Sequence, residues 1–153
     1  MAKLSDILYY IMANYPNKSD ISNARLTKIV YLADWKMSLD KKKQLTNINW
    51  YFDNYGPFVW DVKNCIDENP NIFTQEQTFN SFGSKKIQFG ILDRCYTPEI
   101  DDEEKILLDF VISSTSPLNW DSFINLVYST YPITSSERYS HLNLIEKAIE
   151  YRT

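Results

Sequence analysis

Apolar side chains recur at intervals of three or four residues over residues 4–15, and this spacing predicts an amphipathic helix. Its apolar stripe consists of Leu4, Ile7, Leu8, Ile11, Met12 and Tyr15. Pro16 follows the stripe and ends the helix, because proline cannot continue the backbone hydrogen bonds. We expect a second helix to start where Ser19 or Asp20 can cap it and to continue to about Leu39.

The second predicted helix carries apolar or aromatic side chains on two sides. One face holds Leu26, Ile29, Val30, Ala33 and Met37. Lys28, Tyr31 and Trp35 fall on nearly the opposite face at the helical step of about 100°. Such a helix is either enclosed by the rest of the domain or presents one side to a partner, and a central, enclosed helix is the preferred interpretation.

Residues 47–53 alternate between polar and apolar side chains, which predicts a short strand, with a helix N-terminus as the competing interpretation. Gly56 and Pro57 then predict a corner between this strand and a helix. Proline keeps the preceding residue out of the helical region and fits the first turn of a helix, while glycine permits positive φ. The helix after the corner would carry one apolar stripe and end near residues 69–70; the stripe consists of Val59, Val62 and Ile66.

Two strand-like stretches, residues 72–79 and 85–92, flank a turn at Gly83 and predict a hairpin that joins the 47–53 strand in a small antiparallel sheet. Helical patterns return near the C-terminus, separated by a break at 113–117 and a polar connector at 133–140. The expected fold is α+β and mainly α-helical: a single compact helical domain, residues 1–153, with a small antiparallel β-sheet or hairpin in the middle.

Charge is unevenly distributed along the chain, whose net charge is −4. Residues 1–63 contain nine Lys or Arg against six Asp or Glu, whereas residues 64–153 contain seven against fourteen. The acidic total and the lack of a dense basic stripe argue against nucleic acid as the main partner. A DNA-binding regulator would have to use Lys36 and residues 41–43 on phosphates, and no predicted helix carries a basic face for contacts with bases.

The residues that enzymes commonly use for catalysis or cofactor binding are scarce. The three glycines are spaced too widely for a dinucleotide-binding or phosphate-binding loop. His141 is the single histidine, so neither a four-ligand zinc site nor a favourable catalytic triad is expected. Cys65 and Cys95 do not make a disulfide framework and indicate a reducing cytoplasm. We therefore expect no cofactor, no metal and no membrane span.

The four acidic residues 101–104 raise one enzymatic alternative, a metal-dependent hydrolase or nuclease, because hard cations take oxygen ligands. Acidic side chains are also favoured in the first turn of a helix, where they cap the free N–H groups and face the positive end of the helix dipole. Capping is the preferred interpretation, because side chains of one turn point around the helix axis and do not readily converge on a metal.

Several short motifs follow one another along the chain. The stretch RLTKIVYLADW at residues 25–35 contains L-x-K, two apolar residues and a tyrosine, followed by an aromatic residue. Leu45, NWYF at 49–52 and YGPFV at 55–59 come next, and LVYSTYP at 126–132 closes the series. In order and spacing these motifs resemble the Panacea domain of the SocA-like antitoxin family of bacteria and their phages.

Two departures from the family pattern stand out. Phe58 occupies a position where the family's Y-G-P-V corner often has valine, and Trp60 follows shortly after it. Residues 67–99 contain no motif that aligns with the family.

The resemblance implies an antitoxin that neutralises a cognate toxin, usually encoded next to it, by direct protein–protein binding. SocA-like members also act as adaptors that deliver a partner to a cytoplasmic protease, and this is the alternative function. Neither role needs a catalytic residue, so the protein is not expected to be an enzyme. The expected partner is a toxin protein, with a cytoplasmic protease as the second candidate.

Exposed aromatic side chains are expected at the contact surface, because interface hot spots favour Trp, Tyr and Arg. Trp60 is the first candidate, since it projects away from the apolar stripe of its helix, and Phe58 lies beside it in the sequence. Tyr31, Trp35 and Lys28 are the second candidates, and the alternative for them is burial inside the domain. The glycine and proline of the corner keep a structural role.

Overall fold

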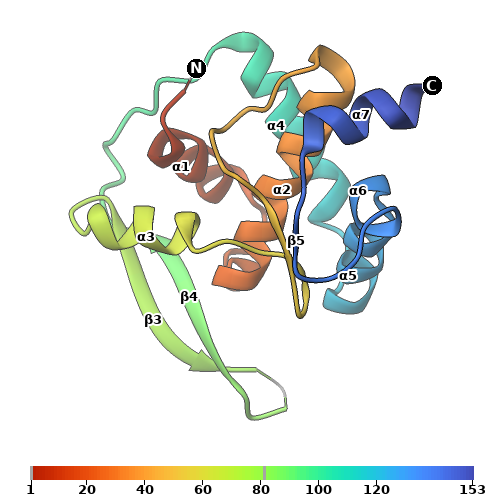
Figure 1. The fold of residues 1–153 in the computed structure, drawn as a ribbon. Coiled ribbons are helices and arrows are strands. Elements are labelled where there is room, and N and C mark those ends of the chain that lie inside the picture. The colour runs from red at the N-terminus through yellow and green to blue at the C-terminus, as the bar shows by residue number, and fades with distance from the viewer. Residues whose placement is uncertain (1, 81) are drawn as a thin grey trace.

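The computed structural model describes residues 2–80 and 82–153, and α-helices dominate it (Figure 1). The helices are α1 Leu4–Asn14, α2 Asn23–Lys41, α3 Asp61–Glu68, α4 Asp102–Thr115, α5 Trp120–Ser129, α6 Tyr131–Thr134 and α7 Leu144–Arg152, with a short 3-10 helix η1 at Lys18–Asp20. The strands are β1 Tyr51–Asp53, β2 Gly56–Pro57, β3 Phe73–Phe79, β4 Lys85–Ile91 and β5 Ser140–His141. The expected α+β, mainly helical fold is confirmed.

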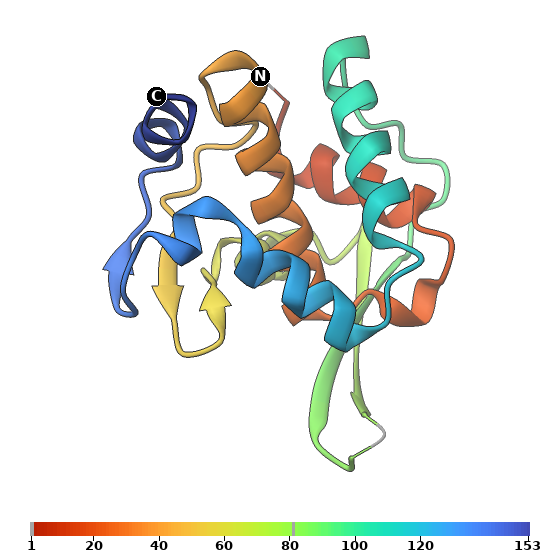
Figure 2. The same cartoon turned by 90° about the vertical axis from the view of Figure 1, so that its right-hand side faces the viewer.

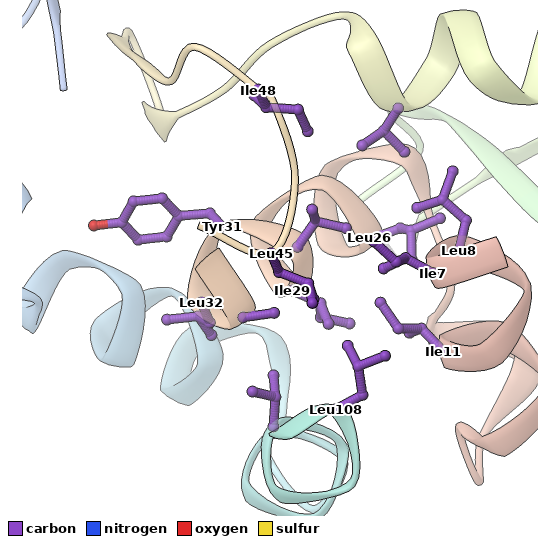
Figure 3. Packing of buried hydrophobic residues seen from close by; sticks show 14 of the residues in the cluster. Ile7, Leu8, Ile11, Leu26, Ile29, Tyr31, Leu32, Leu45, Ile48 and Leu108 are labelled. Carbon is purple, nitrogen blue, oxygen red and sulfur yellow. The ribbon is translucent and has the colours of Figure 1, made fainter. Parts of the chain in front are cut away.

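Helix α2 runs through the middle of the fold and is enclosed on both faces (Figures 1 and 2). The aliphatic side chains of its first face meet Ile7, Leu8 and Ile11 of α1 and Leu108 of α4 (Figure 3). On the other face, Lys28, Tyr31 and Trp35 each expose less than a tenth of their surface. The prediction of a central, enclosed helix is therefore confirmed.

The start of α2 differs from the prediction. Ser22 caps the helix by accepting a hydrogen bond from the backbone N–H of Arg25 at 3.1 Å, whereas Ser19 and Asp20 lie in η1. The carbonyl oxygen of Ile21 accepts the N–H of Phe89 at 2.9 Å, and Ser22 forms an isolated bridge with β4. Because this pairing keeps the chain extended, the helix begins after it.

The predicted hairpin is confirmed as β3 and β4, which pair over their whole length and project away from the helices (Figures 1 and 2). The expected turn includes Ser81, which lies outside the described residues. The expectation that this hairpin joins the earlier strand in one sheet is wrong. Strand β1 instead pairs with β2 and β5, so the fold contains two separate small sheets.

The corner at Gly56 and Pro57 is the second strand of a tight hairpin. Asp53 pairs with Gly56 across a two-residue turn, and the N–H of Phe58 donates to the carbonyl of Tyr51 at 2.9 Å. Gly56 has φ +93°, so the expected positive φ is confirmed. The placement of Pro57 in the first turn of a helix is wrong: strand pairing continues past it, and α3 begins only at Asp61.

A buried carboxylate fastens the segment after α2 to that helix. Asp34 accepts hydrogen bonds from the backbone N–H of Thr46 at 2.8 Å, from the Thr46 hydroxyl at 2.6 Å and from the indole N–H of Trp50 at 2.8 Å. Burial raises the pKa of Asp34, while these hydrogen bonds act in the opposite direction. The resulting position of Trp50 sets where β1 begins.

A buried arginine of α2 contacts the ends of α1 and α4 and the first turn of α5 in a similar way. The guanidinium group of Arg25 donates to the Tyr15 hydroxyl at 3.0 Å and to the carbonyl oxygens of Thr115 and Leu118 at 2.8 and 2.9 Å. It also lies 4.5 Å from the centre of the Phe123 ring. These contacts fix the start of α5 relative to α1 and α2.

The segment before α7 also differs from prediction. Residues 133–140 were expected to form a polar connector, but they include the end of α6 and the start of β5, and α7 begins at Leu144. The N–H of Leu142 donates to the carbonyl of Trp50 at 2.8 Å, which holds this stretch extended beside β1. Asn143 then caps α7 by accepting the N–H of Glu146. Within the described residues, no helix combines the length and the apolar character that crossing a bilayer requires.

Candidate functional site

An aromatic pocket of about 420 Å³ lies between the first turns of α2, the β1–β2 turn and α5. We call it the Lys28 pocket. It is lined by Ala24, Lys28, Asp53, Asn54, Tyr55, Phe58, Trp120, Ile124 and Tyr128. Most of these side chains are apolar or aromatic, with one cationic and one anionic group among them, a composition typical of ligand-binding sites.

Two of the walls are single faces of helices. Ala24 and Lys28 are four residues apart on α2, so they lie one turn apart on the same side. Trp120, Ile124 and Tyr128 repeat the same spacing along α5. The Asn119 side chain starts α5 by accepting the N–H of Ser122 at 2.8 Å, which fixes the helical register that turns this stripe toward the pocket.

The third wall is the β1–β2 turn. Asn54 and Tyr55 form the turn, and Gly56 follows with a Cα hydrogen that points at α5: a Cβ at this position would lie 3.5 Å from the Tyr128 ring. Arg138 donates to the Asn54 carbonyl at 3.2 Å, and the Tyr139 hydroxyl donates to the Asn54 side chain. The segment before β5 therefore supports the turn from outside.

Lys28 is the charged group at the inner end of the pocket, with 3% of its surface exposed. Its Nζ lies 5.7 Å from the centre of the Phe58 ring. Among the described residues, Nζ has no hydrogen-bond acceptor and no carboxylate oxygen within 4.0 Å. Burial lowers the pKa of Lys28 to about 8, and the negative charge of Asp53 partly opposes this effect.

Exposed aromatic side chains surround the mouth of the pocket. Tyr55 exposes 80% of its surface and Trp120 exposes 46%. Trp60 is 60% exposed, and its ring meets the half-buried Phe58 ring edge to face at 5.1 Å between centroids. Exposed aromatic groups gathered around a concave site are typical of interaction surfaces, so this surface is a candidate interface.

Tyr31 and Trp35 lie in the interior. The Tyr31 side chain is fully buried, and its hydroxyl points away from the aliphatic core (Figure 3) and forms a 2.8 Å hydrogen bond with the Thr130 hydroxyl. Its ring meets the Trp50 ring at 5.5 Å. Trp35 packs against Tyr151 of α7. Neither residue lines the Lys28 pocket, and their burial agrees with the alternative considered for them.

The structure thus brings Lys28 and Phe58 together in one pocket and places Trp60 beside it. It adds residues that were not selected from the sequence, above all Trp120 and Tyr128 of α5. The signal for these two was present: an aromatic residue at each end of a stripe with four-residue spacing. The spacing alone could not say that this stripe faces a pocket rather than the core.

The acidic residues 101–104 act as a helix cap. Asp101 accepts the N–H of Glu104 at 2.8 Å, and Glu104 accepts the N–H of Asp101 at 3.1 Å, which makes a capping box. Capping was the preferred interpretation and is confirmed. Among the described residues, no three His, Cys, Asp or Glu side chains are grouped so that they could hold a metal ion. His141 of β5 pairs with Tyr51 of β1, and the two rings meet edge to face.

Comparison with protein families identifies the chain. A family model described as "Antitoxin SocA-like, Panacea domain" matches residues 26–132, which is more than half of the chain. The protein therefore belongs to the SocA-like antitoxin family with a Panacea domain, as its motifs indicated, and has a toxin–antitoxin-related role. No curated protein and no solved structure matches the chain. Apart from Ala24, every residue that lines the Lys28 pocket lies within the matched range.

Proposed function

We propose that the protein is an antitoxin that neutralises a toxin encoded by a neighbouring gene by binding it directly. We further propose that the toxin binds over the Lys28 pocket and the adjacent Trp60. The observation that carries this proposal is the convergence of three separate family motifs on one pocket. Lys28 comes from the first motif, Phe58 from the glycine–proline corner and Tyr128 from the last.

The character of the surface supports binding to a protein. Aromatic side chains lose little conformational entropy when they are fixed, and each covers a large contact area, so they dominate interface energetics. Tyr55, Trp60 and Trp120 are exposed at or beside the mouth of a concave site, where a protruding side chain of a partner would be surrounded by apolar groups. The pocket has one cation and one anion, too little positive charge for a nucleic-acid surface.

A non-enzymatic role in the cytoplasm is part of the proposal. Family membership suggests a non-enzymatic role, since neutralisation by binding requires no reacting group. Cys65 and Cys95 are both free thiols, which suits a reducing compartment. We also propose that residues 1–153 act as one domain, because α1 and α7, which lie outside the family match, contribute Ile7, Leu8 and Leu144 to the same core.

A growth experiment tests the proposal. The neighbouring gene is expressed alone and then together with this protein in the same cells. Arrest by the neighbour alone and recovery on co-expression are the expected results, and a variant with Trp60→Ala should restore growth less well. No recovery on co-expression would refute the antitoxin function.

The level of the toxin during recovery separates binding from the alternative, delivery to a protease. Neutralisation by binding predicts that the toxin persists at an unchanged level in the rescued cells and is recovered in complex with this protein. A toxin level that falls on co-expression, and is restored when a cytoplasmic protease is deleted, would establish the adaptor function in its place.

A further inference from the structure

We infer that the Lys28 pocket binds an acidic side chain of the protein partner, with the carboxylate next to the Lys28 ammonium group and the aliphatic stem between the aromatic walls. This inference rests on the proposed function and specifies the chemistry of the toxin's contact: an Asp or Glu that protrudes from its surface with apolar neighbours. Three observations support it. Lys28 is buried and donates no hydrogen bond to another described residue, the walls of the pocket are largely apolar, and the charge of Asp53 is better stabilised than that of Lys28.

Lys28 is a buried cation that donates no hydrogen bond to another described residue. An ammonium group donates three hydrogen bonds, and removing it from water is costly unless acceptors replace the water. Lys28 is more than nine-tenths buried, yet within the described part of the chain no oxygen accepts a hydrogen bond from its Nζ. The Phe58 ring offers a cation–π contact at 5.7 Å, which compensates for only part of the lost hydration. A carboxylate that enters the pocket would supply the missing acceptors.

The walls suit the stem of such a side chain. Phe58, Ile124 and Tyr128 present rings and methyl groups around a volume of about 420 Å³, enough for a side chain of several carbon atoms. Charge pairs are strong where water is excluded, because the surrounding dielectric constant is low. An acidic group carried on an apolar stem therefore gains from both parts of the pocket.

Asp53 also lines the pocket, so a cation is the competing occupant. Its side chain is only half buried and already accepts the backbone N–H of Asn54 at 2.9 Å. Partial exposure to solvent and this hydrogen bond stabilise the charge of Asp53, whereas Lys28 is only 3% exposed and donates no hydrogen bond to another described residue. A charged ligand gains the most binding free energy where it pairs with the less stabilised charge of the pocket, which is Lys28. The pocket should therefore prefer an anion over a cation.

Three small probes of matched shape test this choice without the toxin: 3-phenylpropionate, 3-phenylpropanol and 3-phenylpropylamine. Each is titrated into the ¹⁵N-labelled full chain near neutral pH while the amide resonances are followed by NMR. The carboxylate should shift the amides of Ala24, Asn54, Tyr55 and Ile124, and it should bind about tenfold more tightly than the alcohol, as expected for a charge-assisted hydrogen bond.

Three results of this titration would overturn the inference. Equal affinity for the acid and the alcohol would show that Lys28 does not select charge. Tighter binding of the amine would assign the pocket to a cation held by Asp53. Shifts elsewhere, or no shifts, would show that the pocket does not bind these groups. Shifts of the pocket amides on raising the protein concentration alone would assign it to a second copy of this chain.

The variant Lys28→Met keeps the length and apolar volume of the side chain and removes its charge. It should bind the acid and the alcohol equally, and its amide spectrum reports whether it is folded. If it does not fold, the comparison of the three probes on the wild-type chain still decides. The NMR titration contains no toxin, so its failure would not refute the antitoxin function. Conversely, a failure of growth recovery would not refute the preference of the pocket for an anion.

Discussion

The Lys28 Nζ lies 5.7 Å from the centre of the Phe58 ring, and this contact joins the central helix to the corner after β2. On its other side, the Phe58 ring meets the exposed Trp60. A family motif on α2 is thus connected through a single aromatic ring to Trp60, an exposed aromatic group on this surface. Phe58 makes this connection because its ring meets both neighbours, which a side chain without a ring could not do.

Lys28 should make stability depend on pH. Burial lowers the pKa of Lys28 to about 8, below the ordinary lysine value of 10.5, so the folded state binds fewer protons than the unfolded state between these two pH values. Stability contributed by this residue therefore rises with pH through that window. Relative to Lys28→Met, the wild-type free energy of unfolding should increase by about 2 kcal/mol between about pH 7 and about pH 9.5.

Urea denaturation of both proteins at the two pH values measures this difference. Tyrosines with raised pKa values titrate in both proteins, and so cancel in the comparison. A difference that stays constant with pH would show that Lys28 is not held in a desolvated position.

Trp60 and Trp35 should respond to alanine in opposite ways. Trp35 is 7% exposed and packs on α7, so Trp35→Ala should lower the free energy of unfolding by about 3–5 kcal/mol. Trp60 is largely exposed, and Trp60→Ala should change stability by no more than about 0.5 kcal/mol. Thermal or urea unfolding of the two variants provides the measurement. A large loss of stability in the Trp60 variant would make it a structural residue rather than a contact residue.

Gly56→Ala should destabilise the fold through backbone strain. A non-glycine residue at φ +93° costs about 1–2 kcal/mol, whereas the new methyl group would lie at an ordinary contact distance from Tyr128. Gly83→Ala is the matched control, since Gly83 has φ +80° and no atom within 4 Å of a Cβ. Similar losses at both positions in urea denaturation are expected. A loss at Gly56 alone would identify the contact with Tyr128 as the cause.

Asp34→Asn should weaken the attachment of residues 44–50 to α2. The amide has the size of the carboxylate, but it places an NH₂ group where an oxygen accepted hydrogen bonds. At least one of the hydrogen bonds from Thr46 and Trp50 is therefore lost, and the free energy of unfolding should fall by about 2–3 kcal/mol. Asp40→Asn on the same helix is the control, because its exposed pair with Lys36 contributes at most about 1 kcal/mol. Equal effects of the two substitutions on unfolding would contradict the role of Asp34.

Local periodicity was sufficient to predict most helices and the β3–β4 hairpin. The stripe that starts at Leu4 gave α1 to within a residue, because a helix that buries one face must repeat its apolar side chains at the helical period. Capping of α4 was expected from the acidic residues 101–104 ahead of an apolar stripe, and the structure shows it as a capping box between Asp101 and Glu104. These features depend only on residues that are close in the sequence, so a short stretch of sequence is enough to predict them.

Long-range pairing could not be predicted in the same way. Strand β1 pairs with Ser140 and His141, which lie about 90 residues further along the chain. A strand of three residues carries no local sequence pattern that identifies its pairing partner. The late start of α2 has the same origin, since Ser22 pairs with β4. Lys28, Phe58 and Tyr128 each stood in a recognisable motif, but their meeting in one pocket depends on how α2, β2 and α5 pack.

The most direct test of the proposed function is the dissociation constant of the purified neighbour-encoded toxin for this protein and two variants. Wild type should bind, and Trp60→Ala should weaken binding about 30-fold, the effect of losing about 2 kcal/mol at a hot spot. Phe110→Ala is the matched control, because Phe110 is a similarly exposed aromatic residue on α4, which does not line the pocket. Unchanged affinity of that control is expected. Equal affinity of all three proteins would contradict the proposed surface, and no binding of the wild type would contradict neutralisation by direct contact.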